Sequence, residues 1–189
     1  MREHTVKVYE FSELKPEVQA KVLDRERDIN TDGDYWSEET IQDAKEELEG
    51  LGYECVRVLY SGFGSQGDGA CFTARVNMEE WLGKHKLKGK YKRALSAYRE
   101  WGASIEVKHT YRYYFATSTT VETSCDGRDD KTVDEVEAIA ELIRAERETL
   151  GNKLYRELET VYFSLTSDEE VRESIEANGY EYEVNGRRI

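Results

Sequence analysis

Residues 53–76 read YECVRVLYSGFGSQGDGACFTARV, and this stretch sets the fold class. The segments 53–63 and 70–76 are rich in β-branched and aromatic residues, which is typical of strands. Between them lies SGFGSQGDGA, with four glycines in residues 62–69, and glycine-rich segments form turns and loops. The pattern predicts a β-hairpin with a long loop, and therefore an antiparallel sheet.

The sequence on either side of this hairpin alternates between helical and strand patterns. Apolar residues recur at three- and four-residue steps over residues 132–165, which predicts one long helix. Shorter helices are predicted over 16–27, 37–49 and 168–177, a strand over 5–11, and further hairpins over 104–123 and 180–189. We predict a single domain, 1–189, with an α+β fold: an antiparallel sheet built from hairpins, helices packed on one face, and long C-terminal helices.

Charge is distributed unevenly along the chain, which has a net charge of −13. Residues 84–112 carry 9 basic and 2 acidic side chains, whereas residues 134–183 carry 5 basic and 15 acidic ones. Blocks of opposite sign can face different partners. An acidic surface and a basic surface are therefore both candidates for binding.

The chain shows no pattern of a secreted or membrane protein. Its first eleven residues alternate charged and apolar side chains, unlike a signal peptide, and no stretch approaches the roughly 18 apolar residues of a membrane span. The three cysteines, Cys55, Cys71 and Cys125, are odd in number and lack CxxC spacing, so we expect reduced thiols. These features predict a cytoplasmic protein.

Residues 28–39, DINTDGDYWSEE, match the pattern of a calcium-binding loop between two helices. Ca²⁺ prefers roughly six to eight oxygen ligands, and the candidate ligands are Asp28, Asn30, Asp32, Asp34 and Glu39. Arg27 and Tyr35 stand where such motifs carry apolar residues, and no second loop pairs with this one. The alternative is a connecting loop whose carboxylates cap the following helix, with no cofactor.

The glycine-rich loop is a second candidate site, with Ser65, Gln66 and Asp68 as its polar side chains. Backbone N–H groups of such a loop can cradle a phosphate, although no lysine follows at P-loop spacing. In the structural interpretation, the glycines permit a tight crossing while Gln66 and Asp68 bond the loop to itself. Both interpretations stay open at this point.

The sequence contains no motif typical of a catalytic or zinc site. His4, His85 and His109 are scattered, without a second ligand at helical or hairpin spacing. No nucleophile and base can be paired from the sequence pattern. We therefore expect a binding protein rather than an enzyme.

The basic stretch 84–102, KHKLKGKYKRALSAYREWG, interleaves lysines with aromatic residues. This pattern could follow a nucleic-acid backbone. In so acidic a chain, the stretch can equally pair with the protein's own acidic helices. We do not expect direct nucleic-acid binding, but the stretch remains an alternative protein interface.

The acidic C-terminal block is the first candidate for a partner surface. Leu154, Leu158 and Val161 form the inward stripe of the predicted helix, so other positions point outward. The outward candidates are Glu157, Glu159, Asp168, Glu169, Glu170 and Glu173. Such carboxylates could imitate the phosphates of nucleic acid and occupy the basic channel of a protein partner.

The run YSGFGSQGDGACF, residues 60–72, resembles a signature of small proteins encoded by tailed phages and prophages. The segments 9–14 (YEFSEL) and 27–30 (RDIN), with Trp36, resemble the N-terminal third of the same family. The likeness is close over residues 7–76 and loose beyond. Members are often labelled antitoxin of a toxin–antitoxin stability system, and the family brings no catalytic residues to carry over. The resemblance implies a phage accessory protein, a class that includes inhibitors of host defence such as anti-CRISPR proteins.

Two functional hypotheses follow from these patterns. The first is a phage-encoded acidic inhibitor, anti-CRISPR or antitoxin-like, that binds a bacterial defence or toxin complex one to one in the cytoplasm of the infected host. Nucleic-acid mimicry is the mechanism that its charge favours. The alternative is a ligand-binding module that holds a nucleotide or a signalling molecule on the glycine-rich loop.

Overall fold

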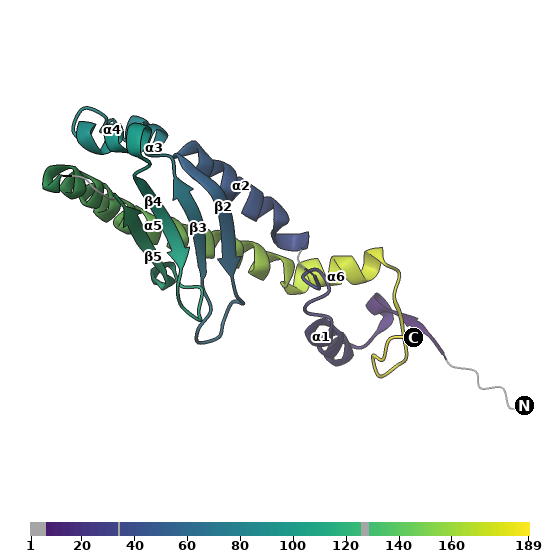
Figure 1. The fold of residues 1–189 in the computed structure, drawn as a ribbon. Coiled ribbons are helices and arrows are strands. Elements are labelled where there is room, and N and C mark those ends of the chain that lie inside the picture. Colours follow the sequence, from purple (N-terminus) through teal and green to yellow (C-terminus); the bar gives the residue numbers. More distant parts are fainter. Residues whose placement is uncertain (1–6, 34, 126–128) are drawn as a thin grey trace, which may run out of the picture. The chain divides into compact units, whose positions relative to one another are not determined.

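The computed structural model describes residues 7–33, 35–125 and 129–189 (Figure 1). The chain divides into two compact units, which we treat separately. We call Glu39–Glu159 the sheet unit, and Met1–Glu38 with Thr160–Ile189 the terminal unit. Whether the two fold as a single domain stays a prediction.

A four-stranded antiparallel sheet, in the order β2-β3-β4-β5, forms the sheet unit's centre. The strands are β2 (Tyr53–Tyr60), β3 (Ala70–Val76), β4 (Ser104–His109) and β5 (Thr119–Ser124). The hairpin expected from residues 53–76 pairs β2 with β3, and the second expected hairpin pairs β4 with β5. Alternation along each strand turns Phe72 and Val107 into the core.

Two helices, α2 (Glu38–Gly50) and α5 (Asp130–Leu165), cover one face of this sheet (Figure 1). The stripe of Val136, Ile139 and Ile143 on α5 is buried and packs in one cluster with Phe72 and Val107. Full burial of each such side chain contributes about 1.5–3 kcal/mol. The apolar periodicity of residues 132–165 therefore reports the face that meets the sheet.

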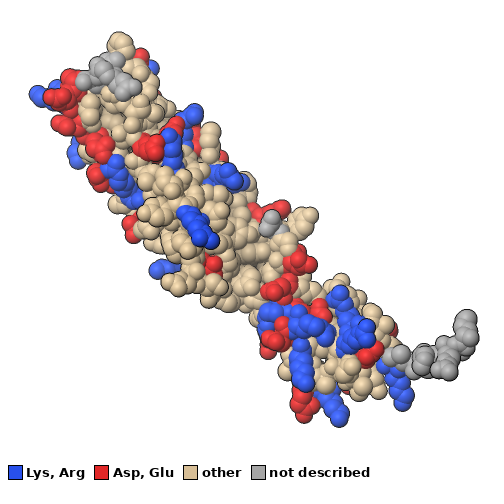
Figure 2. Space-filling model, turned by 60° about the horizontal axis from the view of Figure 1, so that its bottom comes forward, with Lys and Arg blue, Asp and Glu red and all other residues tan. Residues whose placement is uncertain are grey.

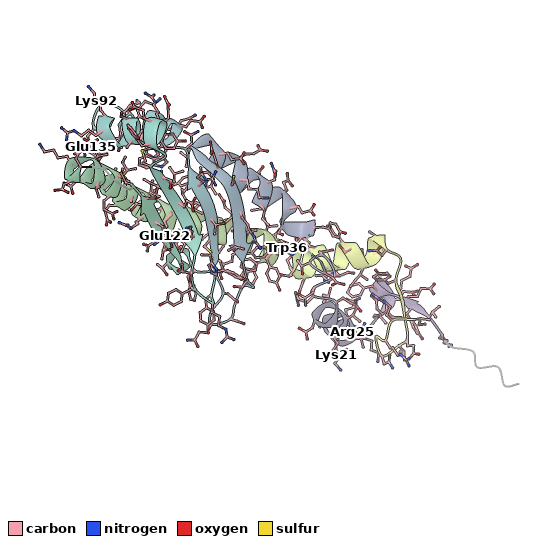
Figure 3. The ribbon with its side chains drawn as sticks, in the orientation of Figure 1. Lys21, Arg25, Trp36, Lys92, Glu122 and Glu135 are labelled. Atoms are coloured by element: carbon pink, nitrogen blue, oxygen red, sulfur yellow. The ribbon has the colours of Figure 1, made fainter. Side chains whose placement is uncertain are left out.

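The connection from β3 to β4 forms two short helices, α3 (Met78–Lys84) and α4 (Lys92–Trp101). The backbone N–H of Glu80 donates to Asn77 Oδ1 at 3.1 Å, so Asn77 caps α3. The first turn of α4 is capped from α5, because Glu135 Oε2 accepts the N–H groups of Arg93 and Ala94 at 2.9 and 3.1 Å (Figure 3). The carboxylate also stabilises the positive end of the α4 dipole.

The basic stretch 84–102 pairs with acidic side chains of the same chain. Arg99 forms an ion pair with Glu79, and Lys88 Nζ lies 3.6 Å from the same carboxylate. Arg93 Nη1 lies 3.7 Å from Asp129 Oδ1. These ion pairs agree with the alternative in which the basic stretch pairs with acidic side chains of the same protein.

The terminal unit has a small core of its own. Its elements are β1 (Tyr9–Glu10), the 3-10 helices η1 (Phe11–Glu13) and η2 (Tyr35–Ser37), α1 (Pro16–Arg25), the end of α5, α6 (Asp168–Ala177) and β6 (Glu181–Tyr182). β1 and β6 pair antiparallel, with Tyr9 opposite Tyr182. Buried side chains from both chain ends meet in one cluster: Phe11, Leu14, Val22, Leu23, Val171, Ile175 and Tyr182.

The predicted fold class is confirmed: an α+β fold with antiparallel sheets and a long helix near the C-terminus. The helix α6 has the bounds expected from the sequence, and α5 begins two residues before its expected start at residue 132. The pairing of β6 with β1 was not foreseen, since residues 180–189 were expected to pair with themselves. The segment also folds back on itself as expected: the N–H of Glu183 donates to the Arg187 carbonyl oxygen at 2.9 Å, the N–H of Ile189 donates to the Glu181 carbonyl oxygen at 3.1 Å, and Tyr182 bridges to Arg188. The first two residues of the expected strand 5–11 lie outside the described part of the chain.

Candidate functional site

The loop between β2 and β3 is closed by its own hydrogen bonds. The N–H of Ser65 donates to Asp68 Oδ2 at 2.7 Å, and the N–H of Asp68 donates to the carbonyl oxygen of Ser65 at 3.2 Å. At its base, the Ser61 N–H donates to the Gly69 carbonyl oxygen at 3.0 Å. Asp68 therefore bonds the loop to itself, as the structural interpretation expected. The same expectation for Gln66 is not met, because its side chain is exposed, as is that of Ser65, and forms no hydrogen bond within the described part of the chain.

Two glycines of this loop are needed because residues 110–118, between β4 and β5, pack directly on it. Gly67 has a φ of +108°, and a Cβ there would lie 2.9 Å from Tyr113 Cε1. A Cβ on Gly69 would lie 3.0 Å from both Phe115 Cα and the Tyr114 carbonyl oxygen. We call the surface made by residues 61–69 and 110–118 the loop end of the sheet unit.

The helix α5 approaches the loop end closely at a third glycine. A Cβ on Gly151 would lie 2.8 Å from Ala116 Cβ and 3.4 Å from the Ala70 carbonyl oxygen. The side chains one turn to either side of Gly151 therefore face the loops across a short gap.

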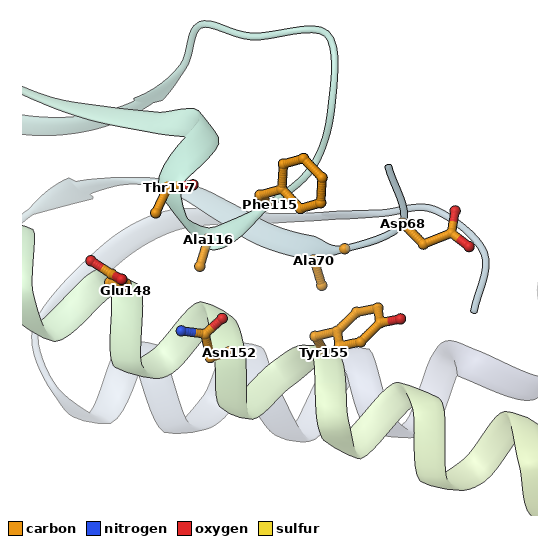
Figure 4. A pocket seen from close by; sticks show the side chains of 9 residues that line it. Asp68, Ala70, Phe115, Ala116, Thr117, Glu148, Asn152 and Tyr155 are labelled. Carbon is orange, nitrogen blue, oxygen red and sulfur yellow. The ribbon is translucent and has the colours of Figure 1, made fainter. Parts of the chain in front are cut away.

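This gap contains a cavity of about 320 Å³ (Figure 4). The helix α5 contributes Glu148, Asn152 and Tyr155, at i, i+4 and i+7 along one face. Asp68 and Phe115 come from the two loops. The remaining lining residues are Gly69, Ala70, Ala116 and Thr117.

The polar groups of this cavity are acidic or neutral. Its two charged lining residues are Asp68 and Glu148. Burial, with the charges of Glu159 and Asp68, holds the pKa of the Tyr155 hydroxyl above its ordinary value. The nearby Arg147 donates hydrogen bonds from Nη1 to the Ala116 carbonyl oxygen at 2.5 Å and to Thr119 Oγ1 at 2.7 Å. The cavity therefore favours a positively charged or neutral ligand over an anion.

Aromatic side chains are exposed at the tip of the loop end. Tyr111 is 71% exposed, Tyr113 46% and Phe115 39%, and Arg112 lies over the Tyr113 ring, 5.9 Å from its centroid. Exposed aromatic residues next to an arginine are typical of protein interfaces.

The predicted calcium ligands are partly engaged in the terminal unit. Asn30 Nδ2 donates to the Leu165 carbonyl oxygen at 3.0 Å, and Asn30 Oδ1 accepts from Ser174 Oγ at 2.6 Å. Asp28 Oδ1 accepts from the Tyr162 hydroxyl at 3.4 Å. Asp34 lies outside the described residues, and Glu39 belongs to the sheet unit. Over the described residues, no three His, Cys, Asp or Glu side chains are placed to hold a metal ion. Calcium binding stays a prediction.

The six acidic candidates for a partner surface fall into two groups. Glu157 and Glu159 belong to the sheet unit, whereas Asp168, Glu169, Glu170 and Glu173 lie on α6 in the terminal unit. Two carboxylates have basic neighbours: Asp168 lies 2.5 Å from Arg27, and Glu157 lies 3.6 Å from Lys153. On the face drawn in Figure 2, acidic and basic side chains are interspersed. The exposed pair Glu169 and Glu173 is the clearest remaining acidic feature.

A cluster that the sequence did not indicate centres on Glu146 of α5. The Tyr53 hydroxyl and Trp81 Nε1 donate to Glu146 Oε2 at 2.6 and 2.7 Å, and His85 Nε2 lies 2.7 Å from Oε1. We call Tyr53, Trp81, His85 and Glu146 the Glu146 cluster. It joins β2, α3 and α5 inside the sheet unit.

Within the Glu146 cluster, both ring nitrogens of His85 face acceptors. Nδ1 lies 2.7 Å from the Trp81 carbonyl oxygen, so both contacts are hydrogen bonds only when both nitrogens carry protons. The His85 ring also stacks on the Trp81 indole at 3.9 Å between centroids. Burial, reinforced by the Glu146 charge, raises the pKa of Tyr53 well above its ordinary value. The cluster holds its polar groups in place and leaves no ring nitrogen for proton transfer to a substrate.

The sequence prediction found Asp68 but missed the rest of the cavity and the whole Glu146 cluster. The spacing of Glu148, Asn152 and Tyr155 shows that they share a helix face, but not what that face meets. The cluster joins residues 61 and 93 positions apart in the sequence, beyond the reach of any local pattern. His109 contacts its own turn, 3.0 Å from the Tyr113 carbonyl oxygen, and His4 is outside the described residues.

A family model described as a domain of unknown function (DUF8835) matches residues 36–168. No curated protein and no solved structure matches the chain. Among the described residues, no helix is both long enough and apolar enough to cross a membrane.

Proposed function

We propose that the loop end carries the function of this protein and that this function is binding. The chain belongs to the family described as a domain of unknown function (DUF8835), and the matched residues 36–168 include the loop end. The proposed role is that of a phage-encoded acidic inhibitor that binds a bacterial defence or toxin complex one to one. It would act in the cytoplasm of the infected host.

The observation that carries this proposal is the exposure of three aromatic side chains on one short segment. Tyr111, Tyr113 and Phe115 lie within five residues of one another, with Arg112 among them. Leaving such side chains in water costs hydrophobic free energy, which a partner surface would recover. Tyrosine and arginine are also the residues that most often dominate the binding energy of interfaces.

Binding is favoured over catalysis by the way the titratable groups are used. Asp68 closes its own loop through Oδ2. The His85–Glu146 pair resembles a catalytic dyad, but both of its ring nitrogens already face acceptors within the protein. A general base needs a free nitrogen within reach of its substrate.

The phage setting and the acidic mechanism rest on the sequence. The resemblance of residues 60–72 supports a phage origin, and the net charge of −13 favours a basic partner. If nucleic-acid mimicry contributes, Glu169 and Glu173 on α6 are its best candidates, because both are exposed.

The cavity favours a second candidate, a ligand-binding module. Its volume lies at the lower end of the roughly 300–1,000 Å³ of small-molecule sites. The two carboxylates that line the cavity repel phosphate groups. They therefore argue against a nucleotide, one of the ligands that the glycine-rich loop suggested.

The inhibitor proposal is tested by capture and reconstitution. Tagged protein is incubated with lysate of bacteria that carry defence and toxin systems, and the captured complex is identified by mass spectrometry and rebuilt from purified components. We expect inhibition to be complete at a one-to-one ratio of inhibitor to target. The double variant Tyr111→Ser with Tyr113→Ser should lower the affinity for the target roughly tenfold or more.

The control for that experiment is Trp101→Ser, which removes another exposed aromatic side chain of the sheet unit, at the end of α4. If Trp101→Ser lowers the affinity as much as the double variant does, the loop tip is not the specific interface, and a loss in Trp101→Ser alone would place the interface on the basic stretch 84–102. Inhibition at far less than one equivalent would point to an enzyme.

A further inference from the structure

We propose that the cavity beside the glycine-rich loop binds a linear diamine or polyamine, an elongated dication with an apolar middle. This inference concerns a small ligand and goes beyond the proposed inhibitor role. It rests on the placement, bonding and surroundings of the two carboxylates that line the cavity.

The two acidic residues stand at opposite ends of the cavity. In Figure 4, Glu148 lies at one end of the row that α5 contributes, and Asp68 lies at the other end, beyond Tyr155, with its carboxylate turned toward its own loop. One small cation cannot neutralise both ends, whereas a chain with an amine at each end can.

Each carboxylate keeps the capacity to bind. Glu148 is exposed and accepts no hydrogen bond from any residue that the structure describes. Asp68 uses Oδ2 on the Ser65 N–H, and its Oδ1 accepts nothing from the described part of the chain. A protonated amine bound to a carboxylate forms a charge-assisted hydrogen bond, which is about twice as strong as a neutral one.

The middle of the cavity suits methylene groups. The methyl groups of Ala70 and Ala116 and the rings of Phe115 and Tyr155 line the space between its ends. The aromatic rings can also attract an ammonium group through their π faces. Asn152 adds an amide oxygen that can accept from an amine.

The local charge also favours a cation. None of the nine lining residues is basic, and Glu159 adds a further negative charge next to Tyr155. The guanidinium of Arg147 donates to Ala116 and Thr119, although it also interacts with the charge of Glu148. An acidic cavity with hydrophobic walls therefore selects for a dication over a phosphate, a sugar or a neutral metabolite.

The test is calorimetric titration at fixed ionic strength with three probes of equal chain length: 1,4-diaminobutane, 1-aminobutane and 1,4-butanediol. We expect the diamine to bind at least about tenfold more tightly than the monoamine, and the diol not to bind. Glu148→Gln should weaken diamine binding about tenfold, the size of one charge-assisted contact.

Glu49→Gln is the matched control, because it removes the same charge from an exposed position on α2 of the same unit. It should leave the affinity within about twofold, a change of under 0.5 kcal/mol. Equal weakening by both variants would show mere attraction to an acidic protein and overturn the proposal. So would equal binding of diamine and monoamine, or no binding of the diamine to a protein whose melting temperature is normal. None of these results bears on the inhibitor role, which the loop-tip variants test separately.

Discussion

Glu146 and Glu148 lie two positions apart on α5, and the protein uses them in opposite ways. Glu146 accepts from Tyr53 and Trp81 and meets His85, and its side chain is 21% exposed. Glu148 is exposed and lines the cavity. Because neighbours at this spacing face different sides of a helix, one helix serves the core and the site at once.

The difference distinguishes a carboxylate that stabilises the fold from a carboxylate that is available to a ligand. A partly buried acid whose oxygens are both engaged stabilises the fold and has little left to offer a ligand. An exposed acid next to a cavity, whose oxygens accept no hydrogen bond from the described part of the chain, remains available to a ligand. The same reasoning separates His85, whose ring nitrogens both face partners inside the protein, from a catalytic histidine.

The largest expected effect is the loss of stability on Glu146→Leu. The substitution leaves the Tyr53 hydroxyl and Trp81 Nε1 without their acceptor and His85 Nε2 without its carboxylate partner, which should cost about 3 kcal/mol of unfolding free energy. Urea unfolding measures it, with Glu148→Leu as the control at under about 0.5 kcal/mol. A similar loss of unfolding free energy in both variants would contradict the difference between Glu146 and Glu148.

A smaller loss is expected from Gly151→Ala, which pushes α5 away from the loop end. The new Cβ would lie 2.8 Å from Ala116 Cβ and 3.2 Å from its Cα, so backbone must move. We expect a net cost of about 1–2 kcal/mol, although alanine is the better helix former by about 1 kcal/mol. Gly50→Ala meets nothing within 4 Å and should cost nothing. If Gly151→Ala stabilises the protein, the contact is looser than described.

The smallest effect concerns alkaline pH. Because burial and Glu146 raise the folded pKa of Tyr53, its hydroxyl stays protonated in the folded protein while the unfolded chain ionises near pH 10. The stability that Tyr53 contributes is thus complete below pH 10 and declines above it, by about 1.4 kcal/mol at pH 11. Unfolding of Tyr53→Phe over pH 9–11 should lack this part of the decline. Identical slopes in variant and parent would show that Tyr53 is not held protonated.

Much of the fold followed from local patterns. The strands of the 53–76 hairpin and the helix over residues 168–177 depend on neighbours within a few residues, which periodicity and turn chemistry report. Asp68 could be assigned for the same reason, since its partner Ser65 is three residues away.

What could not be predicted depends on distant parts of the chain. The pairing of Tyr9 with Tyr182 joins the two ends of the sequence. The cavity needs α5 to meet two loops, and Gly151 marks that contact only once Ala116 is known to lie opposite. In the helical pattern alone, Gly151 was indistinguishable from a tolerated glycine.

The most direct test of the account measures stability and diamine affinity together in Glu146→Gln and Glu148→Gln. We expect a crossed result. Glu148→Gln should lose about tenfold in affinity for 1,4-diaminobutane at unchanged stability. Glu146→Gln should lose stability and, under conditions where it is folded, bind the diamine as the parent does. If the two properties fall together in both variants, or if Glu146→Gln is the one that loses affinity, the division of α5 into a structural and a binding carboxylate is wrong.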